Sequence, residues 1–396
     1  MMKRKLLHTP EGVRDIYNSE CARKRILQEG LHELFRQYGY HAIETPTFEF
    51  FDIFSQEIGT TPSKDLYKFF DREGNTLVLR PDITPSIARC VAKYYAEEEF
   101  PVRLCYMGNT FINNSSYQGR LKESTQLGVE LIGDNSVDAD AEIIALAAHA
   151  LKTAGLKEFQ IGVGHVGIFQ GLSKAAGLAE DTEQELLALI ANKNFFGVEE
   201  LVGSQQLPPA LMELFSMLGS PSVPEGMMKR AKELAAPFPE VLHALGRLGQ
   251  LMEMLDDYGV GKYVSIELGM LSSYQYYTGI IFSGYTFGTG EPIVKGGRYD
   301  QLLTYFGKEA PSIGFAVVAD QLLAALSRQK IKISVKDNGT LLVYKEAKKA
   351  EAIRKASSLR EEGAWVSLVR WEGSRTQEDY QAYARRMHMP EVLFLP

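Results

Sequence analysis

The stretch RLCYMGNTFINNSSYQGRLKESTQLGVELIG, residues 103–133, decides the fold. It has two apolar arms separated by a polar loop. In the second arm polar and glycine positions alternate with apolar ones: Gln126, Gly128 and Glu130 against Leu127, Val129 and Leu131. A period of two is typical of a strand that packs one face on a core. The pattern predicts a strand–loop–strand unit in which Gln126 and Glu130 point to the same side, into a pocket or into solvent.

The bulk composition is that of an ordinary globular protein. The chain has 396 residues, enough for two or three domains. Its formal charge is −7 and it has no block of basic residues, which argues against nucleic acid, and so against tRNA, as the main partner. No run approaches the roughly 20 apolar residues that cross a bilayer, so we expect no membrane partner.

The three cysteines are scattered along the chain, at Cys21, Cys90 and Cys105. An odd, scattered set fits a reducing compartment and no disulfide framework, and we expect a cytoplasmic protein. None lies near another cysteine or a histidine at the spacing of a zinc site. We therefore expect no metal, and nothing in the sequence calls for a cofactor.

The sequence predicts helices or strands in several further segments. Apolar residues at helical spacing predict a helix from Ser19 to Gly39. A second helix is expected to start near Pro85, and Asp138 is expected to cap a third. Residues 162–167 read GVGHVG, a GxGxxG pattern, but no βαβ unit with a suitably placed acidic residue follows. We therefore interpret this segment as a strand in which His165 is a packed or surface residue.

The motifs resemble those of the class II aminoacyl-tRNA synthetases, and most closely those of histidyl-tRNA synthetase. Gly119-Arg120 followed by QLGVE at 126–130 resembles that family's motif 2, "GR…HQLGVE". Residues 69–84 resemble "F.D..G..L.LRPE.T", with Asp82 in place of the glutamate and Thr84 kept. The helix and the Pro46 strand before them resemble motif 1, which in this family forms the dimer interface.

The second half of the chain carries three more matches. Residues 271–277 resemble the histidine-specific "RGLDYY" element and keep Tyr276 and Tyr277. Residues 296–300 read GGRYD, a full match. Residues 312–322 resemble motif 3, "GFA.G.ERL".

The resemblance implies an α+β fold. It implies a class II synthetase-like antiparallel sheet with flanking helices over residues 1–325, with a helical insertion at about 170–260. Residues 330–396 read as βαβαβ, a small α/β unit that resembles a truncated anticodon-binding domain.

The departures from the family fall on the ATP site. The resemblance places three catalytic arginines at Ile112, Ser272 and Gln321, none of which is basic. Guanidinium groups match the geometry of phosphates and stay charged at any working pH. Losing one such group typically costs about 10² or more in rate, so we expect no adenylate formation and no catalytic residues.

The amino-acid pocket is kept more fully. By resemblance, Asp82, Thr84 and Gln126 meet the α-amino end of histidine, and Glu130 and Tyr277 meet its imidazole. Tyr276 belongs to the same pocket. Carboxylate oxygens suit an ammonium group, and a carboxylate with a phenol can bind both ring nitrogens. Arg120 and Arg298 are candidates for support of the pocket.

A synthetase core that keeps a histidine pocket and loses its ATP arginines resembles the regulatory subunits of ATP phosphoribosyltransferase. The resemblance implies a non-catalytic subunit that works with the short catalytic subunit in the first step of histidine biosynthesis and mediates feedback inhibition by histidine. It implies a homodimer within a hetero-oligomer, with histidine as effector. Two alternatives stay open: a divergent active histidyl-tRNA synthetase, and a histidine-sensing adaptor for another partner.

Overall fold

The computed structural model describes residues 7–54, 61–114, 121–220, 223–271, 276–335 and 339–396. The chain divides into two compact units, Met1–Lys332 and Ile333–Pro396. None of the helices in these ranges is both long and apolar enough to cross a lipid bilayer.

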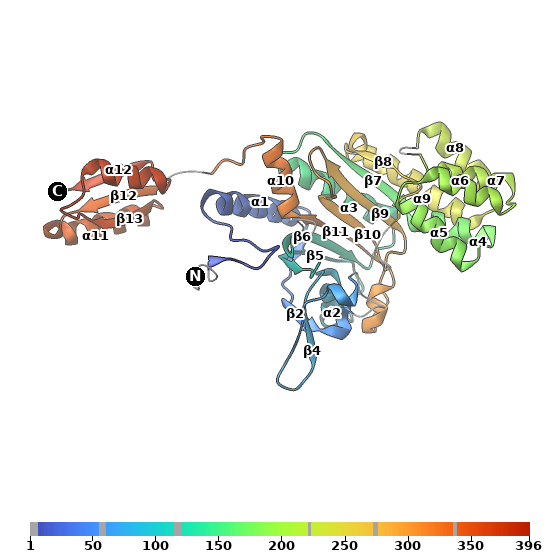
Figure 1. The fold of residues 1–396 in the computed structure, drawn as a ribbon, viewed down its shortest axis with the longest axis horizontal. Coiled ribbons are helices and arrows are strands. Elements are labelled where there is room, and N and C mark those ends of the chain that lie inside the picture. The colour runs from blue at the N-terminus through green and yellow to red at the C-terminus, as the bar shows by residue number, and fades with distance from the viewer. Residues whose placement is uncertain (1–6, 55–60, 115–120, 221–222, 272–275, 336–338) are drawn as a thin grey trace. The chain divides into compact units, whose positions relative to one another are not determined.

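An eight-stranded sheet is the framework of the first unit (Figure 1). Its strand order is β1-β5-β6-β11-β10-β9-β7-β8. The inner pairs are antiparallel, and the outer pairs β1–β5 and β7–β8 are parallel. The strands are His41–Ala42 (β1), Val102–Phe111 (β5), Glu123–Ile132 (β6), Phe159–His165 (β7), Val264–Ile266 (β8), Ile280–Thr286 (β9), Val294–Arg298 (β10) and Ser312–Val318 (β11).

The predicted hairpin is strands β5 and β6 of this sheet. They pair antiparallel over their full length, and Leu104 lies opposite Glu130. Leu127, Val129 and Leu131 are completely buried. Residues of even number on β6 therefore face the opposite side, as the alternation predicts.

Two long helices cover the apolar face of the sheet. They are α1, Asn18–Gln37, and α3, Val137–Thr153. Phe35 of α1 meets Phe315 of β11 edge to face, with 5.9 Å between ring centroids. An edge-to-face contact of this kind adds to the free energy gained by burial.

Two predicted helix starts need correction. Helix α1 begins at Asn18, one residue before the expected Ser19, and no side chain caps it. The cap of α3 is Ser136 and not Asp138: Ser136 Oγ accepts a hydrogen bond from the backbone N–H of Ala139 at 3.1 Å. Asp138 instead lies in the first turn, where a carboxylate interacts favourably with the helix dipole.

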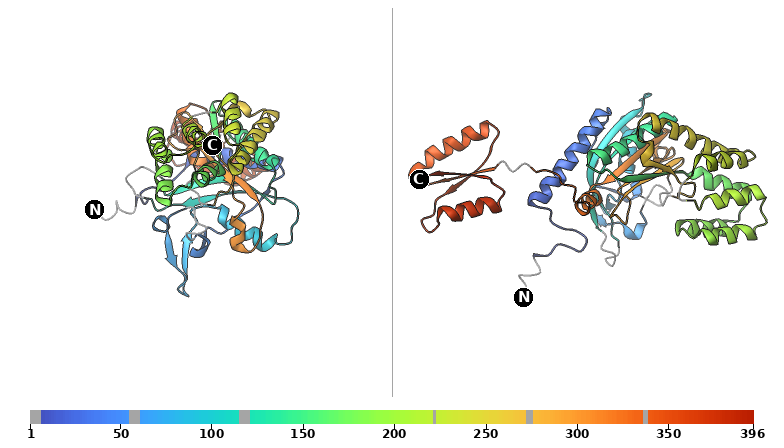
Figure 2. Two further views of the ribbon diagram at one scale, coloured as in Figure 1. Left: turned by 90° about the vertical axis from the view of Figure 1, so that its right-hand side faces the viewer. Right: turned by 90° about the horizontal axis from the view of Figure 1, so that it is seen from above.

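The helices of the expected insertion begin directly after β7. Figure 1 and Figure 2 show its helices gathered beside the end of the large sheet that carries β7 and β9. They are α4 (Val166–Ala176), α5 (Glu180–Ala191), α6 (Phe195–Ser204), α7 (Pro209–Met217), α8 (Glu225–Leu234) and α9 (Pro239–Asp257). Buried leucines such as Leu214, Leu248 and Leu251 form its core.

A small antiparallel sheet and two more helices complete the first unit. The small sheet has the order β2-β4-β3, with strands Phe48–Phe50, Thr76–Leu79 and Lys68–Phe70. Helix α2, Thr84–Tyr94, has Pro85 in its first turn, as predicted. Helix α10, Ala319–Arg328, follows β11. Short 3₁₀ helices span Phe51–Phe54, Ser63–Asp65, Gly261–Tyr263 and Leu302–Phe306.

The second unit has the predicted βαβαβ order. Its elements are β12 (Gly339–Tyr344), a 3₁₀ turn (Glu346–Lys348), α11 (Lys349–Glu361), β13 (Trp365–Arg370), α12 (Gln377–Arg386) and β14 (Glu391–Leu395). The three strands are parallel in the order β13-β12-β14. Leu341 and Val343 pack with α12, whereas Leu342 packs with α11. Period-two alternation on β12 therefore fills both faces of this sheet.

Candidate functional site

A cavity of about 600 Å³ lies on the face of the large sheet opposite α1 and α3. This is within the usual range of ligand pockets, roughly 300–1,000 Å³. It contains all six residues that the sequence analysis assigned to histidine: Asp82, Thr84, Gln126, Glu130, Tyr276 and Tyr277. These come from α2, β6 and the segment before β9, so the fold brings together three distant parts of the chain.

The floor of the cavity is built on glycines. Three of them lie on the neighbouring strands β6, β11 and β10, and a β-carbon at each would collide with a side chain of the pocket. Tyr106 lies over Gly128, Tyr277 over Gly297, and Glu130 over Gly314. The absence of side chains at these positions gives the pocket residues their space. The two adjacent glycines of GGRYD leave space on opposite faces of the sheet. Gly297 leaves space for Tyr277 on the cavity side, and Gly296 leaves space for Phe282 on the other side.

Glu130 is the most deeply placed polar group of the cavity, with 1% of its surface exposed. Thr84 Oγ1 donates a hydrogen bond to its Oε1 at 2.7 Å, and the hydroxyl of Tyr299 donates to its Oε2. Burial raises the pKa of Glu130 to about 8, and the nearby charge of Asp82 adds to the rise, while the two hydroxyls oppose it. Loss of hydration penalises the charged form of a carboxyl group.

Asp82 lies at the entrance to α2. Its Oδ1 accepts from the backbone N–H groups of Ile83 at 2.7 Å and Thr84 at 3.3 Å. Its Oδ2 accepts from the hydroxyl of Tyr276 at 3.3 Å. The helix start thus fixes one oxygen, and the carboxylate is held at the edge of the cavity.

Gln126 presents an unsatisfied acceptor. Its Oε1 is buried and has no hydrogen-bond partner among the described residues. A buried polar atom without a partner is costly and is uncommon in native structures. Together with the Asp82 carboxylate, this carbonyl oxygen suits a ligand that carries N–H donors, such as an ammonium group.

The outer part of the cavity contains two of the three positions where the synthetase motifs have arginine. Ile112 and Gln321 both line it, and Ser272 lies outside the described residues. Two basic residues that the sequence analysis did not single out, Lys295 and Arg328, also line the cavity. The guanidinium of Arg328 donates to the carbonyl of Gly288.

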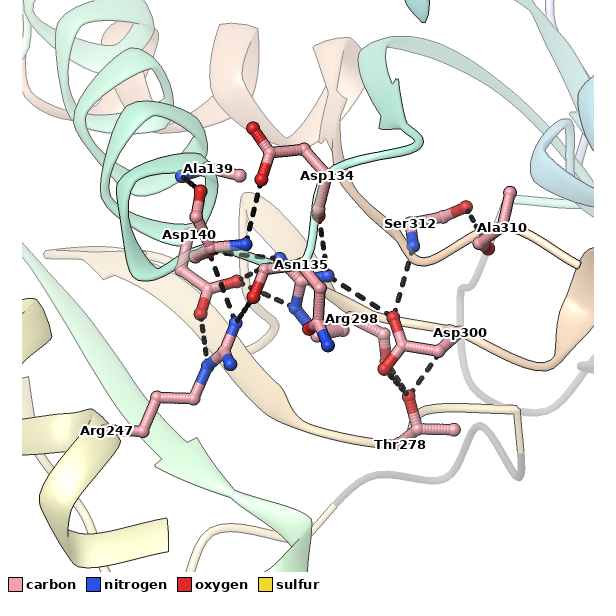
Figure 3. Close-up of polar contacts among 11 residues, drawn as sticks. Asp134, Asn135, Ala139, Asp140, Arg247, Thr278, Arg298, Asp300, Ala310 and Ser312 are labelled. Atoms are coloured by element: carbon pink, nitrogen blue, oxygen red, sulfur yellow. Dashed lines mark hydrogen bonds and ion pairs between the residues drawn. The ribbon is translucent and has the colours of Figure 1, made fainter. Parts of the chain in front are cut away.

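Two arginines, Arg120 and Arg298, were expected to support the histidine pocket, and the structure describes only the second of them. Arg120 lies outside the described residues. Arg298 does not line the cavity, because alternation along β10 turns Lys295 and Gly297 toward the cavity and Arg298 toward α3. Its guanidinium pairs with Asp140 at 2.7 Å, and Asp140 also pairs with Arg247 of α9 at 2.6 Å (Figure 3). Arg298 can therefore act on the pocket only through the backbone it holds.

The GxGxxG segment is the junction of β7 and α4 and is filled by the chain itself. Gly162 and Gly164 make room for Glu267 and Met270. His165 is buried and caps α4, its Nδ1 accepting from the N–H of Gly167 at 3.0 Å. Burial, with nearby Arg247, lowers the pKa of His165 to about 4. His165 is thus a packed residue. Within the described ranges there is no group of three or more His, Cys, Asp or Glu placed to bind a metal ion.

Comparison with known proteins agrees with the motifs. The family model for histidyl-tRNA synthetase matches residues 12–322. An ATP phosphoribosyltransferase regulatory subunit from Acetivibrio thermocellus is 41% identical over 367 residues, which cover 91% of this chain and 86% of that protein. The corresponding subunit of Ruminiclostridium cellulolyticum is 40% identical over 365 residues, with coverages of 91% and 86%.

The chain belongs to the family of ATP phosphoribosyltransferase regulatory subunits. A crystal structure from Bacillus halodurans, described as an ATP phosphoribosyltransferase regulatory subunit/histidyl-tRNA synthetase, has a TM-score of 0.86 at 33% identity and covers 98% of both chains. The predicted class II synthetase-like α+β fold is therefore confirmed.

Two residues of this regulatory-subunit pocket were missed from the sequence. Tyr106 and Tyr299 both line the cavity, and both are almost fully buried. Tyr106 lies on β5, the first strand of the hairpin, directly opposite Gly128 of β6. Pairing a tyrosine with a glycine across a hairpin is a signal that could have placed it. Tyr299 stands within GGRYD, but its approach to Glu130 depends on the turn after β10.

Proposed function

We propose that this chain is a non-catalytic regulatory subunit that binds free histidine in the inner part of the cavity. With the short catalytic subunit of ATP phosphoribosyltransferase, it would support the first step of histidine biosynthesis and mediate feedback inhibition. The catalytic partner is implied by the names of its relatives. Such inhibition requires histidine to bind two states of the complex with unequal affinity.

The observation that carries this proposal is the placement of acceptors at two ends of one small space. Asp82 and the unpartnered Oε1 of Gln126 offer oxygens to an α-ammonium group. Glu130 and Tyr277 lie over the sheet glycines at the other end and offer a carboxyl group and a phenol to a ring. An amino acid with a nitrogen-containing ring matches both ends.

The remaining assignments belong to the same proposal. Motif 1, in α1 and the strand after it, would form a homodimer within the hetero-oligomer. Residues 1–325 would be the synthetase-like core with its insertion, and residues 330–396 a truncated relative of an anticodon-binding domain. Ile112, Ser272 and Gln321 would leave the ATP end without its three guanidinium groups.

The test is reconstitution with a short-form catalytic subunit. We expect ATP phosphoribosyl transfer only in the complex, and inhibition by histidine that Glu130→Gln abolishes while gel filtration still shows an assembled complex. A complex that forms and is inhibited equally with Glu130→Gln would remove the pocket assignment. Failure to bind the catalytic subunit would favour an adaptor for another partner.

One observation favours the alternative of an active synthetase. Lys295 and Arg328 bring positive charge to the outer part of the cavity, where phosphates would lie. Histidine-dependent exchange of pyrophosphate into ATP by the purified chain would establish that activity. We expect no exchange, because one ammonium and one guanidinium at other positions do not replace three guanidinium groups at the motif positions.

A further inference from the structure

The inner end of the cavity is rich in acidic and phenolic groups. Glu130 is faced by Asp82 and Thr84 at the start of α2, Tyr106 from β5 and Tyr299 after β10, and Tyr277, before β9, interacts with both of these tyrosines. Tyr40 also contributes from a greater distance. Among the described residues, no lysine, arginine or histidine forms an ion pair with Glu130.

The basic residues of the cavity lie in other parts of it. Strand register places Glu130 opposite Gly314, and Gly314 opposite Gly297. Lys295 lies in the neighbouring row, opposite Ala316. Arg328 lies at the last residue of α10. A buried carboxylate without a cationic partner is strongly disfavoured, so the empty site favours the neutral acid.

The two hydrogen-bond partners of Glu130 are hydroxyl groups, which can bind a carboxyl group with or without its proton. A backbone N–H or a guanidinium can only donate a hydrogen bond, whereas a hydroxyl can donate or accept. Thr84 and Tyr299 can therefore satisfy Glu130 in both of its protonation states. They hold the carboxyl group in one position in either state, and as donors they favour the carboxylate.

We propose that the pocket binds the ligand's ring as a cation, and that Glu130 supplies the proton. When a neutral imidazole enters, the proton leaves the carboxyl oxygen of Glu130 and joins the unprotonated ring nitrogen. A carboxylate and an imidazolium then face each other, and the total number of protons is unchanged. Thr84 and Tyr299 are positioning residues that stabilise the carboxylate formed in this step. The inference rests on the proposed binding of histidine.

The proposal fixes the pH dependence of affinity. In the empty site Glu130 keeps its proton up to a pKa of about 8, and a free imidazole loses its own near 6.5. Between these values binding exchanges no proton with solvent, and affinity is constant. Above about pH 8 binding takes up one proton, and affinity falls by up to about tenfold per pH unit. Below about 6.5 binding releases one proton, and affinity falls again.

Nitrogen NMR of ring-labelled histidine bound to the full chain tests this directly. At pH 7.5 we expect the bound ring to show two protonated nitrogens, although free histidine is then mostly neutral. In Glu130→Gln a bound ring should be neutral. A neutral ring bound to the wild-type chain would overturn the inference alone, as would a cationic ring in both proteins. If no histidine binds, the proposed function and this inference fail together.

The roles of the two hydroxyls have their own readout. Thr84→Val and Tyr299→Phe each remove one donor to Glu130, and the bound ring should then lose its proton at a lower pH than in the wild type. Thr84→Ser should restore the wild-type titration. Tyr380→Phe is the matched control, since it removes a buried tyrosine hydroxyl of the second unit that donates to the carbonyl of Arg370 at 3.4 Å. An equal shift in Tyr380→Phe, or no shift in both donor variants, would contradict the positioning role.

Discussion

The carboxyl group of Glu130 on β6 lies over the Cα of Gly314 on β11, in the space that a β-carbon at position 314 would fill. The two residues are direct partners in the sheet. The position of the carboxyl group therefore depends on the absence of one methyl group on the neighbouring strand.

Gly314→Ala should consequently displace Glu130 and weaken histidine binding. Forcing extra volume into a packed site costs about 1–3 kcal/mol of stability. We expect a lower denaturation midpoint together with loss of histidine binding in calorimetry. Gly246→Ala is the control: its β-carbon meets nothing within 4 Å, it lies in helix α9, and it should leave binding intact. Unchanged affinity in Gly314→Ala would show that Glu130 does not contact the ligand.

Gln126→Met should separate stability from binding. The variant replaces a buried carbonyl oxygen that lacks a partner by an apolar group of similar length. Because an unsatisfied buried acceptor costs about 1–3 kcal/mol, we expect the empty protein to be as stable as the wild type or more so in urea. Histidine affinity should fall by roughly tenfold or more, because the variant loses the charge-assisted hydrogen bond between Gln126 and the α-ammonium group of the ligand. Gln160→Met, at an exposed position of β7, should change neither quantity.

Asp140→Ala should destabilise the first unit strongly. Asp140 is completely buried and joins Arg298 of β10 to Arg247 of α9, so it links the sheet to the helical insertion (Figure 3). The variant takes from Arg298 and Arg247 the carboxylate that they share, and breaking a buried ion pair in this way costs about 3–5 kcal/mol. Thermal unfolding would detect this loss. The exposed pair of Arg230 with Glu213 provides the comparison, and Arg230→Ala should leave the midpoint almost unchanged.

The pKa of Glu130 predicts a pH dependence of stability. The folded chain keeps this proton up to about pH 8, whereas the unfolded chain loses it near the ordinary pKa of a glutamate, about 4.5. Between these values the folded state binds more protons, so the contribution of Glu130 to stability falls as pH rises, by at most about 1.4 kcal/mol per pH unit.

Urea unfolding of wild type and Glu130→Gln at several pH values measures that contribution, because the glutamine does not titrate. We expect the stability of the wild type relative to the variant to decrease from pH 5 to pH 8 and then to level off. A constant difference over this range would show that Glu130 is ionised in the folded chain throughout.

Much of the fold could be predicted from local patterns. The alternation at residues 126–131 placed Gln126 and Glu130 on one face of a strand, and the structure confirms it. Helix starts were less secure, because Ser136 and Asp138 are both good capping residues and only backbone geometry decides between them.

The site residues divide in the same way. The six assigned to histidine on matched motifs line the cavity. The place of Tyr299 depends on the turn after β10, and that of Gly314 depends on the register of β6 with β11. Arg298, in the matched GGRYD element, was named as a candidate for support of the pocket, but alternation on β10 turns it to the other face. Long-range register is set by packing across the sheet and leaves little local signal.

The central claim is that the cavity binds histidine without ATP. Titration calorimetry of the purified chain, first with histidine and then with ATP, tests it most directly. The account predicts one saturable histidine site per chain, whose affinity Glu130→Gln lowers, and no heat of binding for ATP. Saturable ATP binding of similar or greater affinity, or no heat with millimolar histidine, would contradict it.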